Sequence, residues 1–255
     1  GYDASNEIED EISRKQFQLG KRTSITKFDA PKAINDNFIS LDMIVSTEIN
    51  QIVIGVGELT KQWKEKNRNV FRFKTENIPF RFALSSANYA VKKEKYKGKS
   101  FEVYFHPSHH ENVAHLIKNA KITMDYCETS FGEYPFKTIR FAEISSFTKG
   151  FNATAYPATI FMNESMSFHC NILADKQQDV INELAGHELS HLWWGNSQID
   201  PDDREGDVML TETLAMYTEL MLLKKMYGKQ KVEENIAMHQ DIFESEKGFS
   251  GDVPL

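Results

Sequence analysis

The sequence predicts an α+β protein in which an antiparallel β region precedes a mixed region built from helices and strands. Hydrophobic residues recur with a period of two between residues 38 and 105, as in strands with one buried face. After Pro107 the period lengthens toward the 3.6 residues of a helix. Two further helical segments with apolar surroundings follow after residue 180. With 255 residues and 40% hydrophobic content, the chain can bury one large core or two modest ones.

The N-terminal part divides into a lead-in and a set of strands. Residues 1–20 are polar and charged, and we expect an extended or partly helical segment there. The alternating hydrophobic residues that follow are Ile39, Leu41, Met43, Val45, Phe71, Phe73, Phe80, Phe82, Leu84, Phe101, Val103 and Phe105. Glycine, asparagine and proline separate these runs and indicate turns. Residues 1–106 are therefore predicted to be a partial N-terminal β domain.

A helix is predicted directly after this region, and residues 107–255 are assigned to a second domain. Ser108 and Glu111 have the spacing of a capping box. One apolar stripe follows, and Gly132 is the expected helix end; the stripe consists of Val113, Leu116, Ile117, Ala120, Met124 and Cys127. Residues 138–144 and 158–162 are predicted strands.

The main candidate for chemistry is His187-Glu188-Leu189-Ser190-His191. Histidines at i and i+4 on a helix face the same way, so their ring nitrogens can converge on one ion. The glutamate between them lies where a base for a metal-bound water is needed. Solvated histidines on an amphipathic helix would be the alternative, but the flanking residues are apolar, and unpaired polar groups there would cost a few kcal/mol.

A third ligand is predicted on the next helical segment, residues 208–223, which ends before Gly228. Glu212 interrupts its apolar run, and binding a cation would account for a carboxylate there. His187, His191 and Glu212 would leave one zinc position open, as in catalytic sites. Glu219 either orients a ligating histidine or is an ordinary helix-surface carboxylate. Glu205 and Asp207 are rival ligands in a polar, turn-rich segment.

These motifs resemble the gluzincin aminopeptidases, relatives of aminopeptidase N. The resemblance rests on residues 187–196 and on Leu210-Thr211-Glu212-Thr213-Leu214-Ala215. It implies a thermolysin-like catalytic domain, here truncated at its C-terminal end, that binds Zn²⁺ and hydrolyses peptides with Glu188 as general base. Residues 192–211 separate His191 from Glu212, two more than is usual in the family. The segment 199–215 is most similar to a bacterial branch fused behind transporter membrane segments.

Two departures from the family pattern bear on the activity. Ala155 stands where the family has the glutamate that holds the substrate's free amino group. The family's oxyanion-stabilising tyrosine falls outside this chain, and losing one such donor costs about 10²–10³ in turnover. The chain alone is therefore expected to bind zinc and to cleave peptides weakly or not at all. An endopeptidase, or a non-catalytic peptide-binding or transporter-accessory module, are the alternatives to an aminopeptidase.

Composition limits the partners. The net charge of −7 gives no basic surface, which argues against nucleic acid. The sequence contains no apolar run long enough to cross a membrane, so a membrane would be reached only through segments absent from this chain. We expect a soluble piece, the extracytoplasmic domain of a bacterial membrane protein if the branch assignment holds. Histidines 106, 109, 110, 115, 169 and 239 lack ligand spacing and are predicted to be surface or locally hydrogen-bonded residues.

Overall fold

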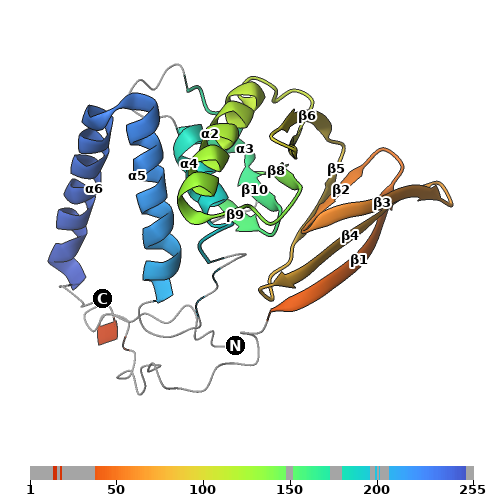
Figure 1. The fold of residues 1–255 in the computed structure, drawn as a ribbon, viewed down its shortest axis with the longest axis horizontal. Coiled ribbons are helices and arrows are strands. Elements are labelled where there is room, and N and C mark those ends of the chain that lie inside the picture. The colour runs from red at the N-terminus through yellow and green to blue at the C-terminus, as the bar shows by residue number, and fades with distance from the viewer. Residues whose placement is uncertain are drawn as a thin grey trace.

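A computed structural model describes residues 14–15, 18, 38–147, 152–172, 180–195, 199, 201 and 207–250. Side chains are described within these ranges except for residues 180–183 and 246–250. The predicted lead-in at residues 1–20 and most of the segment 199–207 therefore lie outside the described residues. Three layers are visible in Figure 1: a small sheet at one end, a central sheet with α2 and α4 packed near it, and the pair α5 and α6 at the other end.

The small sheet is antiparallel with strand order β1-β4-β3. Its strands are β1 (Ile39–Glu48), β4 (Arg68–Ile78) and β3 (Glu58–Glu65). The alternation predicted along β1 is confirmed, because residues 39, 41, 43 and 45 are partly buried and residues 40, 42 and 44 are exposed. A separate two-stranded sheet pairs β2 (Ile52–Gly55) with β5 (Leu84–Ala87).

The strand predicted from Phe80, Phe82 and Leu84 begins later than expected, because residues 80–83 are not in a strand and β5 starts at Leu84. Phe80 and Phe82 are 54% and 52% exposed and precede β5 rather than forming a strand with a buried face. A tight turn, with the Arg81 N–H donating to the Pro79 carbonyl, interrupts the chain here. Alternation alone supplies no partner strand, so this pattern was misleading.

The central sheet has five strands in the order β6-β7-β8-β10-β9. They are β6 (Ala90–Tyr96), β7 (Lys99–Phe105), β8 (Thr138–Ile144), β10 (Thr159–Asn163) and β9 (Ala153–Tyr156). The inner strands β7, β8 and β10 are parallel, and the two edge strands are antiparallel to their neighbours. β8 and β10 confirm the strands predicted there. The predicted domain boundary at residue 107 stays a prediction, and this sheet has strands on both sides of it.

Helix α2 (Val113–Phe131) connects β7 to β8 and covers the sheet. All six residues of its predicted apolar stripe are buried, and Gly132 ends the helix with φ of 110°. Its start differs from the capping-box prediction: the N-cap is Asn112, with no side-chain cap hydrogen bond. In the segment before the helix, the His106 N–H and the His109 ring both bond to Glu143 on β8.

The C-terminal half is helical. After α3 (Glu164–Ser167), α4 (Val180–Ser190) packs against α2 and α5. A single π-helical turn, η3 (Met209–Thr213), continues into α5 (Leu214–Tyr227), and α6 (Lys229–Ser250) follows. The predicted end at Gly228 is confirmed. Among the described residues, no helix is both long and apolar enough to span a bilayer.

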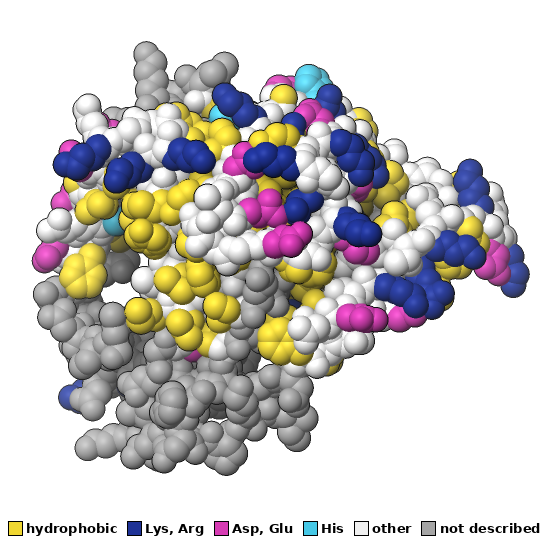
Figure 2. All heavy atoms as spheres, in the orientation of Figure 1, with side chains coloured by type: hydrophobic (Ala, Val, Ile, Leu, Met, Phe, Trp, Pro, Cys, Tyr) yellow, Lys and Arg dark blue, Asp and Glu magenta, His cyan; other side chains and the backbone are white. Residues whose placement is uncertain are grey.

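The largest core cluster joins β7, α2, β8, β10 and α4. Ala185, Leu189, Leu192 and Trp193 contribute to it, so the apolar flanks of the histidine motif anchor α4 in the core. On the face seen in Figure 2, hydrophobic side chains gather over the part occupied by the helices, while Lys and Arg dominate the small sheet. The exposed large hydrophobic residues on η3, α5 and α6 are Met209, Leu210, Tyr217, Tyr227, Ile236, Ile242 and Phe243.

Candidate metal centre

The histidine pair lies at the C-terminal end of α4. His187 is on the last helical turn, and His191 directly follows the helix. The His191 N–H still donates to the His187 carbonyl at 3.3 Å, so the turn continues through it. The ring centroids are 4.8 Å apart and the Nε2 atoms 3.1 Å apart. Both Nε2 atoms therefore converge on one point, as the i, i+4 spacing predicts.

Glu212 reaches the same point from η3. Its Oε2 lies 3.2 Å from His187 Nε2 and 3.6 Å from His191 Nε2. The structure differs from the regular helix predicted over residues 208–223, because Glu212 belongs to the π-helical turn. Such turns occur mostly as single insertions in helices and often at functional sites. The Glu212 side chain is 56% exposed, which leaves one side of the cluster open.

The three ligand atoms fit a zinc ion. Bonds of about 2.0–2.1 Å to His or Glu in a tetrahedron require ligand atoms separated by about 3.3–3.4 Å. The separations of 3.1, 3.2 and 3.6 Å bracket that value. Two imidazoles and one carboxylate are also the donor set of catalytic zinc, with the fourth position left for water.

Outer contacts orient both histidines. His191 Nδ1 donates to the Trp194 carbonyl at 2.9 Å, which fixes the tautomer and leaves Nε2 free to bind metal. Glu219 Oε2 lies 3.6 Å from His187 Nδ1, and its side chain is only 8% exposed. The sequence left two interpretations of Glu219 open. Its burial beside the His187 ring supports the orienting role and argues against an ordinary surface carboxylate.

Gly195 allows η3 to approach α4. It has φ of 95°, and a Cβ there would lie 2.6 Å from Cγ2 of Thr211, the neighbour of Glu212. The Gly195 N–H donates to the Ile199 carbonyl at 2.6 Å. The distance between the histidines and Glu212 thus depends on a residue without a side chain, because any larger residue would push Thr211 away.

The electrostatics are those of a cation site. Burial lowers the pKa of His187, but hydrogen bonds to Glu212 and Glu219 outweigh this effect and raise it to about 9. Hydrogen bonds from His187 and His191 hold the pKa of Glu212 well below its usual range. Positive charge is therefore favoured where these three residues meet.

Glu188 lies against the edge of the central sheet. It is 7% exposed, and burial raises its pKa, although both histidines and a hydrogen bond from the Ala155 backbone act in the opposite direction. Ala155 is on β9, the edge strand of the sheet. The backbone of the segment that lacks the family's glutamate therefore contacts the glutamate of the histidine motif.

The remaining predicted residues fall elsewhere. Asp207 accepts from the Val208 N–H and is not in the cluster, whereas Glu205 lies outside the described residues. Sequence reasoning did not single out Gly195 or the Trp194 carbonyl; the glycine directly after the two tryptophans was the available signal. It also missed that His109 and His169 lie together.

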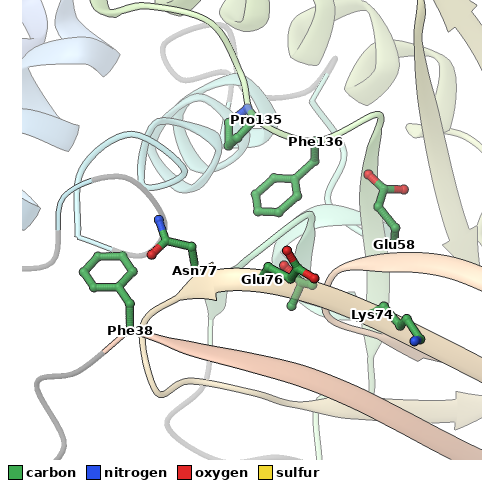
Figure 3. Close-up of a pocket in the computed structure, with 8 residues that line it drawn as sticks. Phe38, Glu58, Lys74, Glu76, Asn77, Pro135 and Phe136 are labelled. Carbon is green, nitrogen blue, oxygen red and sulfur yellow. The ribbon is translucent and has the colours of Figure 1, made fainter.

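A pocket of about 610 Å³ lies away from these residues. Figure 3 shows Pro135 and Phe136, from the loop after α2, above the end of β4 that carries Glu76 and Asn77. Glu58 on its rim accepts hydrogen bonds from Lys137 and Thr138, which ties the small sheet to the start of β8. None of its described lining residues belongs to the histidine cluster. Most of them come from β3, β4 and the loop before β8, so this pocket marks a junction between sheets.

Comparison with known proteins gives a family and a fold. The sequence model described as the peptidase family M1 domain matches residues 115–253, more than half of the chain. A crystal structure of Legionella pneumophila aminopeptidase A in complex with aspartic acid is similar in fold, with a TM-score of 0.63 and 17% sequence identity. The match covers 76% of this chain and 24% of that one, so the chain spans about a quarter of that protein's length. No curated protein sequence matches.

Proposed function

The chain belongs to peptidase family M1, and from that premise we propose that it carries the metal and the base of a peptide-hydrolysing site of aminopeptidase type. His187, His191 and Glu212 would bind Zn²⁺, and Glu188 would act as general base. The observation that carries the proposal is the triangle of ligand atoms with sides of 3.1, 3.2 and 3.6 Å. Zinc, when bound, would supply Lewis acidity toward a water molecule and a peptide carbonyl.

The surroundings of Glu188 support its role. A general base works best when its pKa approaches the working pH, and burial raises the pKa of Glu188. The Ala155 backbone limits the directions in which the carboxylate can point. Glu188 would accept a proton from the attacking water. It would then give this proton to the peptide nitrogen as the C–N bond breaks, so that the product leaves as an amine.

The edge strand β9 supports binding of an extended peptide. Among the described residues, β9 pairs with β10 alone, and the other side of such a strand can add a further strand by backbone hydrogen bonds. Ala155 on this strand offers no charge for a free amino group. This residue favours the second candidate, an endopeptidase that accepts peptides with a blocked N-terminus.

The branch fused to transporter segments stays a prediction. The segment that suggested it, residues 199–215, is described only at residues 199, 201 and 207–215. A non-catalytic binding module remains the third reading of the same residues, and it differs from both peptidases in needing no base.

The rate of peptide hydrolysis by the Glu188→Gln variant distinguishes the two peptidases, which need a base, from the binding module, which does not. We expect zinc content equal to that of the parent and turnover lowered by about 10²–10⁴, measured with matched free and N-acetylated peptides. Glu244→Gln on α6, an exposed carboxylate, is the control and should retain full turnover. Parental turnover in Glu188→Gln would disprove the base assignment.

The two peptides also separate the exopeptidase from the endopeptidase. Cleavage of the free peptide alone supports an aminopeptidase, and cleavage of the acetylated peptide supports the endopeptidase. A parent chain that binds zinc and peptide without any turnover that depends on Glu188 would support the binding module.

A further inference from the structure

A second group of metal-ligating side chains lies outside the histidine motif. It consists of His109, Glu143, Glu164 and His169, whose ligand atoms all lie within 4.8 Å of one another. His109 Nδ1 is 2.5 Å from Glu143 Oε1, and His169 Nε2 is 3.8 Å from Glu164 Oε2. The centroids of the two imidazole rings are 3.8 Å apart. This group, the sheet-edge cluster, shares no residue with the first cluster.

The central sheet brings these residues together. Strands β7, β8 and β10 are parallel, so their carboxyl ends meet at one edge, where α/β proteins commonly bind ligands. His109 follows the end of β7, Glu143 is near the end of β8, and Glu164 directly follows β10. His169 comes two residues after α3.

Both carboxylates are oriented by the backbone. Glu143 Oε2 accepts from the His106 N–H at 2.7 Å, while Oε1 faces His109. Glu164 Oε1 accepts from the Ser146 N–H at 2.8 Å and the Ser146 hydroxyl at 2.9 Å, while Oε2 faces His169. In each glutamate one oxygen is fixed and the other is presented to the cluster, as in carboxylates that ligate metals.

Charge balance calls for a cation. The Glu143 side chain is 5% exposed and Glu164 20%, so two negative charges meet where solvent screens them poorly. One divalent cation with two neutral imidazoles and two carboxylates gives a net charge of zero and satisfies all four groups.

We propose that the sheet-edge cluster binds one divalent transition-metal ion, and zinc is the ion used to test it. Two nitrogen and two oxygen ligands suit zinc and its neighbours better than calcium or magnesium, which prefer oxygen alone. Four protein ligands make a closed site of the structural kind. Because its ligands come from the ends of three strands and the segment after α3, the ion would fix the edge of the sheet beside α4.

Zinc stoichiometry after dialysis against a weak chelator tests the proposal. We expect about two equivalents in the parent chain, about one in His169→Ala, about one in His191→Ala and none in the double variant. His169 is 50% exposed, so its removal should leave the fold intact. His110→Ala, an exposed histidine next to His109, is the control and should retain both equivalents.

The experiment tests the two proposed zinc sites independently. A zinc content unchanged by His169→Ala would overturn the sheet-edge site and leave the proposed function standing. A zinc equivalent that survives His191→Ala and is lost on adding His169→Ala would support the sheet-edge site, whatever becomes of the first cluster.

X-ray absorption at the zinc edge gives a second measurement that does not depend on the His169 variant. In zinc-loaded His191→Ala, we expect only nitrogen and oxygen ligands, with scattering from two imidazoles. A spectrum without imidazole scattering would overturn the proposal. Glu143→Gln in this background keeps the shape of the side chain and should lower the zinc bound.

Discussion

The two candidate metal clusters are built in different ways. Two of the three ligands of the first cluster lie four residues apart at the end of α4, and the third is twenty-one positions further on. The sheet-edge cluster draws its four ligands from separate segments between residues 109 and 169. The histidine pair of the first cluster follows from the spacing of residues on one helix, whereas the second cluster depends on how parallel strands pair. Only the histidine pair could therefore be predicted from a short stretch of sequence.

Removing Glu212 should have the largest effect on this comparison. Glu212→Ala deletes a direct ligand, and we expect zinc affinity at the first cluster to fall by more than the about 10–100-fold typical of losing an outer partner. The sheet-edge cluster should retain its metal. Competition with a chromophoric chelator measures both. Asp207→Asn, at the rival carboxylate, is the control; a loss of zinc there, with none in Glu212→Ala, would reverse the ligand assignment.

The close approach of Gly195 to Thr211 makes the second prediction. In Gly195→Ala the new Cβ would meet Thr211 Cγ2 at 2.6 Å, so η3 and Glu212 must move. We expect zinc affinity at the first cluster to fall by about 10–100-fold, as when an orienting contact is lost.

Gly228→Ala is the matched control for Gly195→Ala. Gly228 has a similar φ of 88°, but a Cβ there meets nothing within 4 Å. Both variants should lose stability of the order of 1–3 kcal/mol from backbone strain, measured by denaturant unfolding, and only Gly195→Ala should lose zinc. Equal zinc affinity in the two would show that the Gly195 contact does not position Glu212.

Glu219 tests the orientation of His187. Glu219→Gln removes the charge beside Nδ1, 3.6 Å away, and keeps the size of the side chain. We expect about tenfold weaker zinc binding at the first cluster, with the sheet-edge cluster unaffected, measured by chelator competition. An unchanged affinity would restore the alternative of a carboxylate without a role in metal binding.

Replacing Asn112 should have the smallest effect on metal binding, and that effect should fall on the sheet-edge cluster. Its Nδ2 donates to the Ser167 and Cys170 carbonyls at 3.2 and 2.9 Å, which holds the segment that carries His169. Asn112→Ala should cost about 1–3 kcal/mol of unfolding free energy and weaken the sheet-edge metal only.

Asn69→Ala is the control for Asn112→Ala. Asn69 is also buried, and its Nδ2 also donates to two backbone carbonyls, those of Ile49 and Gln51. A similar loss of stability with both metals retained is expected. If Asn69→Ala weakened the sheet-edge metal as much as Asn112→Ala, the effect would reflect general stability rather than the position of His169.

The sequence by itself determined the elements whose pattern is local. Four such features follow from spacings of two to four residues: the apolar stripe of α2, the strands β8 and β10, the end of α5 at Gly228, and the convergence of the His187 and His191 rings. Such spacings fix which side chains share a face, because backbone geometry repeats over that distance.

Only the tertiary structure decided how distant segments meet. The strand expected at Phe80 and Phe82 had the right alternation, but both side chains are exposed and no strand in the described part of the chain pairs with them. The capping box predicted before α2 did not form: Asn112 is the N-cap, and the nearby His106 and His109 bond to Glu143 on β8. The sheet-edge cluster exists only because three strands run parallel, and the reach of Glu212 depends on Gly195. Strand pairing and helix packing are set by the whole core, and no local period of the sequence encodes them.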